Sequence, residues 1–299
     1  MSTVFSSALL LVVPLLFAAL GGLVHRASGV VNIGLEGQML AGALVGVLVS
    51  GHTGSWVLGI LGAVLAGGIT GLLMTLVITR LRANAIIVGL GVNILVAGVI
   101  GFVLKWELGV AGTLRIDGLD RVPRWHIDAL DGVPVLREIV NDKDVLFLLA
   151  LVLIPATAWM LRNTAFGLRL RAAGDAETAA ESLGLNVLRK REYAGLIAGV
   201  LAGLGGGYLS LAQVGLFNSQ MIAGRGFIAL AAFYFGRNRP VPTAIACLIF
   251  AFFDAWQGSL QTGTSIGQLL TTLPYLIVVV ALASSAAQQR ARARKLPSS

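Results

Sequence analysis

The chain has 299 residues, of which 57% are hydrophobic and 12% charged, and its mean hydropathy is +0.87. Soluble domains carry roughly 25% charged residues, so this composition excludes a soluble protein and indicates a helical membrane protein. A formal charge of +8 would suit a nucleic-acid-binding protein. We exclude that class because the positive charges are sorted by loop, as a membrane topology requires.

Nine apolar segments are candidates for membrane-spanning helices, because a helix needs ~20 largely apolar residues to cross a bilayer. The second and the seventh are short and flanked by glycine, which predicts broken or partly inserted helices. The sequence therefore predicts one all-α, polytopic transmembrane domain over residues 1–299. The expected spans are residues 4–24, 37–51, 55–79, 84–104, 145–161, 193–214, 222–236, 241–257 and 268–287.

The first apolar segment has no positive charge before it, whereas His25 and Arg26 follow it. A cleavable signal peptide has the opposite arrangement. We therefore expect a retained first span whose N-terminus lies outside.

The positive charges predict the orientation of the remaining spans. Of the 22 Lys and Arg residues, 15 lie in the loop 162–192, in the tail 288–299 or at the other span ends expected on the same side. The loop 105–144 has six basic and eight acidic residues. By the positive-inside rule, 105–144 is an extracytoplasmic loop, 162–192 is cytoplasmic and the C-terminus is inside. The basic tail is expected to contact anionic membrane lipid.

A few polar residues lie in or beside the expected spans. A charged side chain at the centre of a span costs about 2.5–3.5 kcal/mol on insertion scales, so such residues generally face a cavity or a partner. They either line a substrate path or bond neighbouring helices, and the sequence leaves both possibilities open. An ion pair between Glu36 and Arg225 is conceivable. The candidate path residues are Asn32, Glu36, Asn93, Asn218, Gln220 and Arg225.

The glycines form two patterns in the sequence. The segments 28–40 and 215–227 are glycine-rich, interrupt the apolar pattern at comparable places in the two halves and thereby point to a substrate path. Glycines also recur at every fourth position of the sixth span, which allows a close helix approach. Tight packing and a pore are both compatible with this ladder, which consists of Gly195, Gly199, Gly203 and Gly207.

The polar loop Arg162–Glu192 is predicted to contain a short helix. Asp175 is the expected N-cap, Glu177 lies in the first turn and Gly184 is the expected C′ residue. Small residues recur on one helical face, which predicts a docking surface, although an ordinary solvated helix fits the same pattern. That face is formed by Ala176, Ala179, Ala180 and Leu183.

Three stretches resemble motifs of one known family. The run GDAETAAESLGLNV, residues 174–187, is similar to the coupling loop of bacterial ABC importer permeases that move ribose-type sugars, branched-chain amino acids and nucleosides. SGVVNIGLEGQ at 28–38 and GRGFIALAA at 224–232 match the same family in the same order. The resemblance implies that seven residues couple the chain to an ATPase: Gly174, Asp175, Ala179, Ala180, Glu181, Ser182 and Gly184.

The same resemblance implies the rest of an importer in a bacterial plasma (inner) membrane. A second permease, often non-identical in the nucleoside branch, would pair with this chain. A cytoplasmic ABC ATPase would bind ATP and Mg, and an extracytoplasmic binding protein would deliver the substrate. Nucleosides are the expected substrate, ahead of simple sugars and branched-chain amino acids, because the segment 32–37 is most similar to the nucleoside branch.

The sequence lacks the motifs of a nucleotide-binding, catalytic or metal-binding protein. None of its four lysines belongs to a G-x-x-x-x-G-K-[ST] phosphate loop. No catalytic cluster stands out, and the three histidines do not have metal-ligand spacing. We therefore expect no enzyme, cofactor or metal in this chain. An autonomous secondary transporter or channel, or an intramembrane enzyme, remains an alternative.

Overall fold

The computed structural model describes residues 2–125 and 143–260. The expected ninth span, 268–287, and the basic tail, 288–299, lie outside the described residues. The helices are α1 (Ser2–Ala27), α2 (Leu35–Thr53), α3 (Trp56–Arg80), α4 (Ala85–Trp106), α6 (Val145–Asn163), α7 (Ala165–Asp175), α8 (Glu177–Ser182), α9 (Val187–Gly207), α10 (Arg225–Phe235) and α11 (Pro240–Leu260). A π-helical turn, Tyr208–Val214, continues α9.

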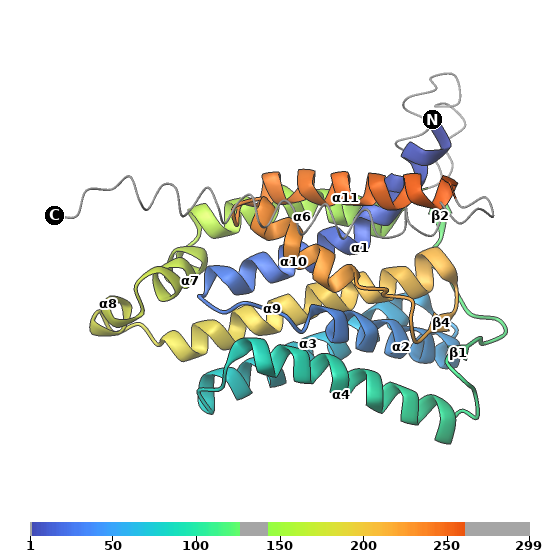
Figure 1. Cartoon of the computed structure of the whole chain (residues 1–299), viewed down its shortest axis with the longest axis horizontal. Coiled ribbons are helices and arrows are strands. Elements are labelled where there is room, and N and C mark those ends of the chain that lie inside the picture. The colour runs from blue at the N-terminus through green and yellow to red at the C-terminus, as the bar shows by residue number, and fades with distance from the viewer. Residues whose placement is uncertain (1, 126–142, 261–299) are drawn as a thin grey trace.

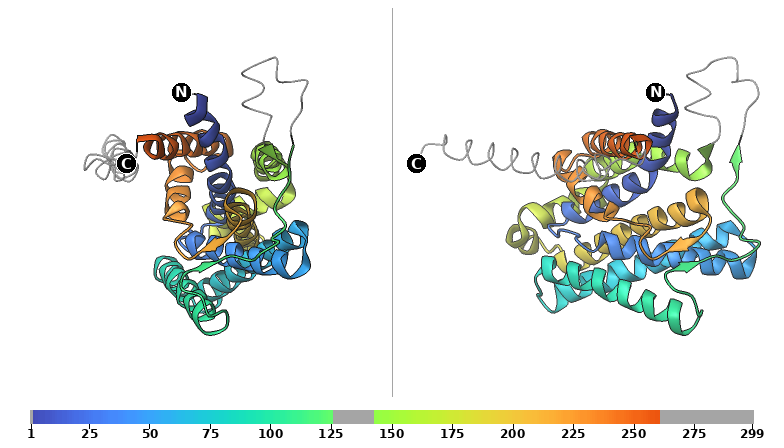
Figure 2. Two further views of the ribbon diagram at one scale, coloured as in Figure 1. Left: turned by 90° about the vertical axis from the view of Figure 1, so that its right-hand side faces the viewer. Right: turned by 45° about the vertical axis from the view of Figure 1, so that its right-hand side comes forward.

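The long helices lie in one bundle, side by side along the longest axis of the molecule (Figure 1). α7 and α8 project at one end, which we call the α8 end. Short strands lie at the opposite end, which we call the strand end, and the right-hand view of Figure 2 shows the same separation. Each half of the chain contributes helices to the bundle, so segments far apart in sequence meet in its interior.

Six helices of the described residues are long and apolar enough to cross a membrane. They correspond to Val4–Ala27, Trp56–Arg80, Ala85–Trp106, Val145–Asn163, Val187–Val214 and Pro240–Gly258. The expected second span is a 19-residue helix rather than a short one, although polar residues such as Gln38 make it less apolar. The expected seventh span is an 11-residue helix, α10, and is therefore short as predicted.

α9 lies at the centre of the bundle, packed against α1, α2 and α3. The glycine ladder makes this packing possible. A Cβ atom added to Gly71 would lie 2.7 Å from the Cα of Gly199, and one added to Gly42 would lie 2.6 Å from the Cα of Gly203. Real Cβ atoms do not approach a backbone so closely, so glycine is required where α9 passes between α2 and α3. The ladder therefore serves tight packing.

α4 lies at the edge of the bundle and exposes large apolar side chains. Ile94 is 74% exposed and Leu95 is 64% exposed. In water such a surface would be unusual, whereas in a bilayer it suits contact with lipid or with another membrane subunit.

Two short antiparallel ladders depart from the all-α expectation. β1 (Thr113–Leu114) pairs with β4 (Phe217–Asn218), and β2 (Arg124–Trp125) pairs with β3 (Lys143–Asp144). The first ladder ties the segment after α4 to the segment before α10. Within the described residues, the two ladders thus join the two halves of the chain at the strand end.

Candidate functional site

α2 begins inside the bundle rather than at its end. The backbone N–H of Gly37 donates to Oδ1 of Asn93 at 2.8 Å. Asn93 lies eight residues after Ala85, which places it ~12 Å along α4 at 1.5 Å per residue. The segment 28–34 therefore runs from the α8 end into the bundle before the helix starts (Figure 1). The interruption before α2 is the break that the glycine-rich segment 28–40 predicts.

α10 also begins inside the bundle. Nη2 of Arg225, the first residue of α10, lies 3.2 Å from Oδ2 of Asp254 on α11. Asp254 is 14 residues after Pro240 and six before Leu260, hence ~21 Å from the start of α11 and ~9 Å from its end. The N-terminal ends of α2 and α10 thus meet at depth, although Glu36 and Gly224 are 188 residues apart in sequence.

The Glu36 carboxylate lies between these two helix ends. Its Oε1 accepts the N–H of Gly224 and its Oε2 accepts the N–H of Gly226, both at 2.8 Å. Because Glu36 is also in the first turn of α2, its negative charge faces the positive ends of two helices. This arrangement explains how a carboxylate is accommodated in an apolar bundle. The conceivable ion pair with Arg225 is not formed, because that guanidinium pairs with Asp254.

Close backbone contact accompanies this carboxylate. A Cβ added to Gly226 would lie 2.6 Å from the Cα of Glu36, and Gly224 has a φ of +79° that favours glycine. The two interrupted segments thus need their glycines in order to meet. The structure therefore explains why the motif 224–232 has glycine at these two positions.

Asn32 and Asn93 are bonded within the protein. Asn32 and Gln38 are fully buried and exchange two amide hydrogen bonds, of 3.0 and 3.3 Å. The Nδ2 of Asn93 donates to the carbonyl of Ile33 at 2.9 Å. These bonds hold the segment 28–34 in place, which is one of the two roles that the sequence leaves open for such residues. Sequence reasoning missed Gln38, although it stands in the motif 28–38.

The other two candidate path residues are at the strand end. The Nδ2 of Asn218 donates to Oγ1 of Thr113 at 2.8 Å, and its Oδ1 accepts the N–H of Gln220. Gln220 itself is exposed. The six candidates therefore form two groups, with Asn32, Glu36, Asn93 and Arg225 at depth and this pair near the end of the bundle.

The predicted N-cap of the short helix was wrong. Asp175 is the last residue of α7, and α8 follows Ala176 without a side-chain cap. The reason lies upstream, because Thr164 caps α7 by accepting the N–H of Gly167 at 3.1 Å and so starts a helix that runs through Asp175. Glu177 is in the first turn of α8, as expected.

Gly184 ends α8 as predicted. Its φ is +81°, its N–H donates to Glu181 at 2.9 Å, and the N–H of Leu185 donates to Ala180 at 3.0 Å. This pair of bonds is the Schellman motif, which satisfies carbonyl groups that the last turn leaves free.

The predicted docking face of α8 is only partly exposed. Ala180 is 5% exposed and packs in a small cluster with Ala173 and Val187. Leu183 is 89% exposed, and Ala179 is exposed as well. In six residues the helix completes less than two turns, so the residues at this spacing do not all face the same neighbour. Glu181 and Ser182 are exposed beside Leu183.

α8 is connected to the segment that leads to Glu36. Arg191 of α9 donates to both carboxylate oxygens of Glu177, each at 2.8 Å, and its Nε donates to the carbonyl of Ser28 at 3.2 Å. Gly174 approaches the same segment, since a Cβ there would lie 2.8 Å from the backbone nitrogen of Gly29. Gly174 is thus a packing residue between α7 and the segment 28–34.

We expect Glu177→Gln to loosen α8. The hydrogen bond from Arg191 lowers the pKa of Glu177 below its ordinary value of 4.5. A lowered pKa means that the stabilisation is present above pH 4.5 and is lost as the pH falls through the lower, folded-state value. The Glu177 side chain is 45% exposed, so the pair contributes ~1 kcal/mol or less. Amide exchange of 176–183 should rise up to roughly fivefold.

The matched control for this variant is Glu181→Gln, a substitution of an exposed glutamate in the same helix. Its amide exchange should remain that of the unsubstituted chain. Equal exchange in all three proteins would show that Arg191 does not hold α8.

The apolar bundle, its two helix ends at depth and the projecting α8 define a multi-pass membrane transport protein. Residues 4–282 match the family described as the permease component of a branched-chain amino acid transport system. The chain belongs to this family of ABC importer permeases, which are transport subunits of the plasma (inner) membrane rather than enzymes. ABC permeases in general work with an ATPase and a substrate-binding protein.

Several relatives match most of the chain. It is 33% identical to the guanosine ABC transporter permease protein NupQ of Bacillus subtilis, over 94% of this chain and 91% of the relative. It is 32% identical to the nucleoside ABC transporter permease protein NupC of Lactococcus lactis, over 90% and 88%. A putative glucose ABC transporter permease protein of Haloferax volcanii, TsgC13, is 29% identical over 81% and 73%. No solved structure matches the chain significantly.

Proposed function

We propose that this permease takes up nucleosides. The observation that carries the proposal is its similarity to two permeases named for guanosine and nucleosides, at 33% and 32% identity over about nine tenths of the chain. Simple sugars are the second candidate, because the glucose permease relative is 29% identical.

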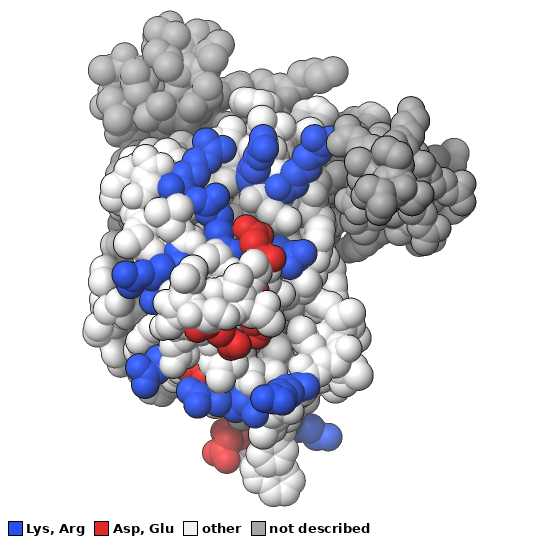
Figure 3. All heavy atoms as spheres, turned by 90° about the vertical axis from the view of Figure 1, so that its left-hand side faces the viewer, with Lys and Arg blue, Asp and Glu red and all other residues white. Residues whose placement is uncertain are grey.

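In the proposed orientation the α8 end faces the cytoplasm and the strand end faces the outside. The charge distribution supports this, since Lys and Arg gather on the α8 end (Figure 3). The whole chain would form one permease domain with nine spans, N-outside and C-inside. A non-identical second permease and an outer binding protein would complete the importer.

The orientation is tested with single cysteines in a Cys247→Ser background. Ser182→Cys at the α8 end should react with an impermeant maleimide only after the cells are permeabilised. Asp117→Cys, an exposed position in the loop after β1, should react in intact cells. Reaction of Ser182→Cys in intact cells would reverse the proposed topology.

In the proposed mechanism α8 transmits the movement of a partner ATPase to the substrate path. A push on the exposed surface around Leu183 would displace α8 together with Arg191 and Gly174. Both residues contact the segment 28–34, which leads to Glu36 and through it to α10. Because Glu36 lies where the two broken helices meet, a displacement that reaches it from α8 would change how their ends meet.

We expect Leu183→Asp to abolish transport without preventing insertion. Leu183 contributes little to the packing of this chain because it is 89% exposed, whereas an apolar residue on a projecting turn suits contact with a partner. Uptake by whole cells, normalised to the amount of permease in the membrane, measures the effect. Normal uptake by this variant would remove α8 from the coupling mechanism.

Ala180→Asp provides the contrast, because it places a charge in the cluster with Ala173 and Val187. That variant should lower thermal stability as well as uptake. A loss of uptake in Leu183→Asp at unchanged thermal stability distinguishes coupling from folding.

The substrate is tested by uptake of labelled guanosine into cells that produce the chain with its cognate partner subunits. Excess adenosine or uridine should compete, and excess ribose or glucose should not. Competition by ribose alone would indicate that the substrate is a sugar rather than a nucleoside. Uptake that continues when the ATPase is inactivated would favour an autonomous transporter.

A further inference from the structure

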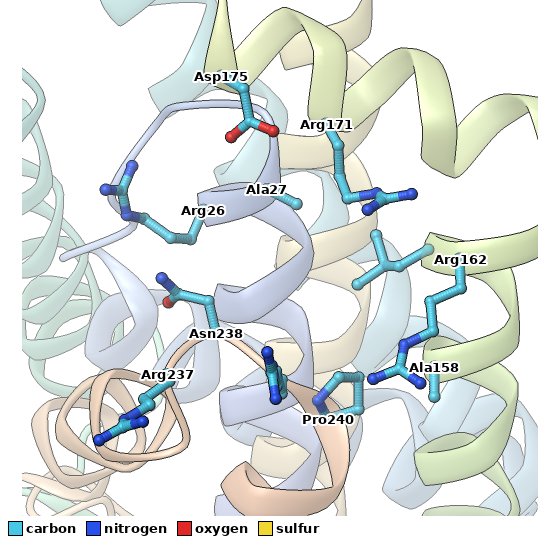
Figure 4. A pocket seen from close by; sticks show the side chains of 12 residues that line it. Arg26, Ala27, Ala158, Arg162, Arg171, Asp175, Arg237, Asn238 and Pro240 are labelled. Atoms are coloured by element: carbon cyan, nitrogen blue, oxygen red, sulfur yellow. The ribbon is translucent and has the colours of Figure 1, made fainter.

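A cavity of about 410 Å³ lies at the α8 end and is rich in arginine (Figure 4). Its arginines come from the end of α1, the end of α6, the middle of α7 and the turn between α10 and α11. They are Arg26, Arg162, Arg171, Arg237 and Arg239. Asp175 is the one acidic residue of the lining, so the lining has an excess of four positive charges.

These arginines differ from others at the same end. Arg80 pairs with Glu192 at 2.7 Å, and Arg191 pairs with Glu177 at 2.8 Å. Among the described residues, none of the five cavity arginines has such an ion pair. Guanidinium groups gathered around a concave space repel one another, and an anion in that space would relieve the repulsion.

A further observation at the cavity favours an anion-binding site. The Nε of Arg26 is buried and has no hydrogen-bond partner within the described part of the chain. The positive φ values of Arg237 and Asn238 have a local cause, because their N–H groups donate to Tyr234 and Phe233 and so end α10.

We propose that this cavity binds a phosphate group. Guanidinium groups offer paired N–H donors that match phosphate oxygens, and several arginines together can neutralise a phosphomonoester or phosphodiester. A phosphate is about the size that can be reached from several walls of such a cavity at once. Two sources share this chemistry, the headgroup of an anionic phospholipid and free inorganic phosphate.

The cavity lies where α7 joins α8, so a ligand bound there would affect the proposed movement of α8. Gly174 and Asp175, which join α7 to α8, belong to its lining. The cavity also includes Arg26 at the end of α1, just before the segment 28–34. A bound phosphate group would therefore link the base of α8 to three other helices and stiffen the part of the chain through which α8 moves.

The test uses the full chain purified in detergent and native mass spectrometry with phosphatidylglycerol. Diacylglycerol with the same acyl chains is the reference lipid, since it lacks only the phosphoglycerol group. The test variant is Arg162→Gln with Arg171→Gln, and both side chains are exposed, so folding does not depend on them. The matched control is Arg169→Gln with Arg189→Gln, which removes two exposed charges outside the cavity.

We expect the unsubstituted chain and the control to bind phosphatidylglycerol more tightly than diacylglycerol. The test variant should bind it at least ~10-fold more weakly, because it loses two charge-assisted contacts. Asp175→Asn should strengthen binding, because it removes the carboxylate that opposes the phosphate. Inorganic phosphate that displaces the lipid, and raises the melting temperature only when Arg162 and Arg171 are present, would assign the site to free phosphate.

Three results would overturn the proposal. The first is equal loss of phosphatidylglycerol binding in the test and control variants, which would indicate general surface charge. The second is equal binding of the two lipids by the unsubstituted chain. The third is a test variant that keeps its lipid and phosphate binding, which would show that Arg162 and Arg171 do not hold the phosphate group.

Discussion

Glu36→Leu should abolish transport and destabilise the junction between α2 and α10. The substitution removes the acceptors of the Gly224 and Gly226 N–H groups, which would then lie unpaired in an apolar bundle. Each buried donor left without a partner costs about 1–3 kcal/mol, so a total loss of about 3 kcal/mol is expected. Unfolding in detergent measures the stability, and amide exchange at residues 224–230 reports on the start of α10.

Two other glutamate variants make this prediction specific. Glu36→Gln keeps one carbonyl acceptor. Its stability in detergent should therefore lie between that of Glu36→Leu and that of the unsubstituted chain. Glu107→Leu changes an exposed glutamate beyond the end of α4 and should leave stability and uptake unchanged. If Glu36→Leu retains normal exchange at 224–230, the carboxylate does not secure the end of α10.

Gly199→Leu should prevent the native packing of α9. A side chain at this position would overlap the backbone of α3, since a Cβ there would lie 2.9 Å from the Cα of Gly71. Overpacking costs typically 1–3 kcal/mol when side chains can move, and backbone cannot yield as a side chain does. We expect a loss of about 3 kcal/mol or more, seen as a strongly lowered melting temperature in detergent and little mature protein in the membrane.

Gly98→Leu is the matched control, because a Cβ at Gly98 has no atom within 4 Å among the described residues and lies on the exposed side of α4. It should leave the melting temperature of the isolated chain unchanged. Equal stability of the two variants would mean that α9 does not depend on close contact with α3.

The sequence predicted features that depend on local chemistry. The start and end of most spans follow from apolar length, and Gly184 ends α8 because a left-handed residue favours glycine there. The interruptions before α2 and α10 were visible as glycine-rich breaks. The close approach of α9 to α3 could be anticipated from glycines spaced by four residues, but the identity of the facing helix could not.

Features that depend on distant partners were not predictable. Periodicity places Ala180 and Leu183 on a common face but does not say which part of a short helix turns toward Ala173. The helix start at Thr164 took precedence over the capping tendency of Asp175. Arg225 is a charged neighbour of Glu36, yet the Glu36 carboxylate accepts backbone N–H groups instead. The reason is that the folded chain places the start of α10 closer to Glu36 than the Arg225 guanidinium.

The meeting of α2 and α10 has a consequence for how the protein is made. α10 has only 11 residues and cannot cross a bilayer by itself, and its first N–H groups find their acceptors on Glu36, which leaves the ribosome far earlier. Unpaired N–H groups are costly in lipid. The acceptors for the first N–H groups of α10 are therefore present only once α2 has been made.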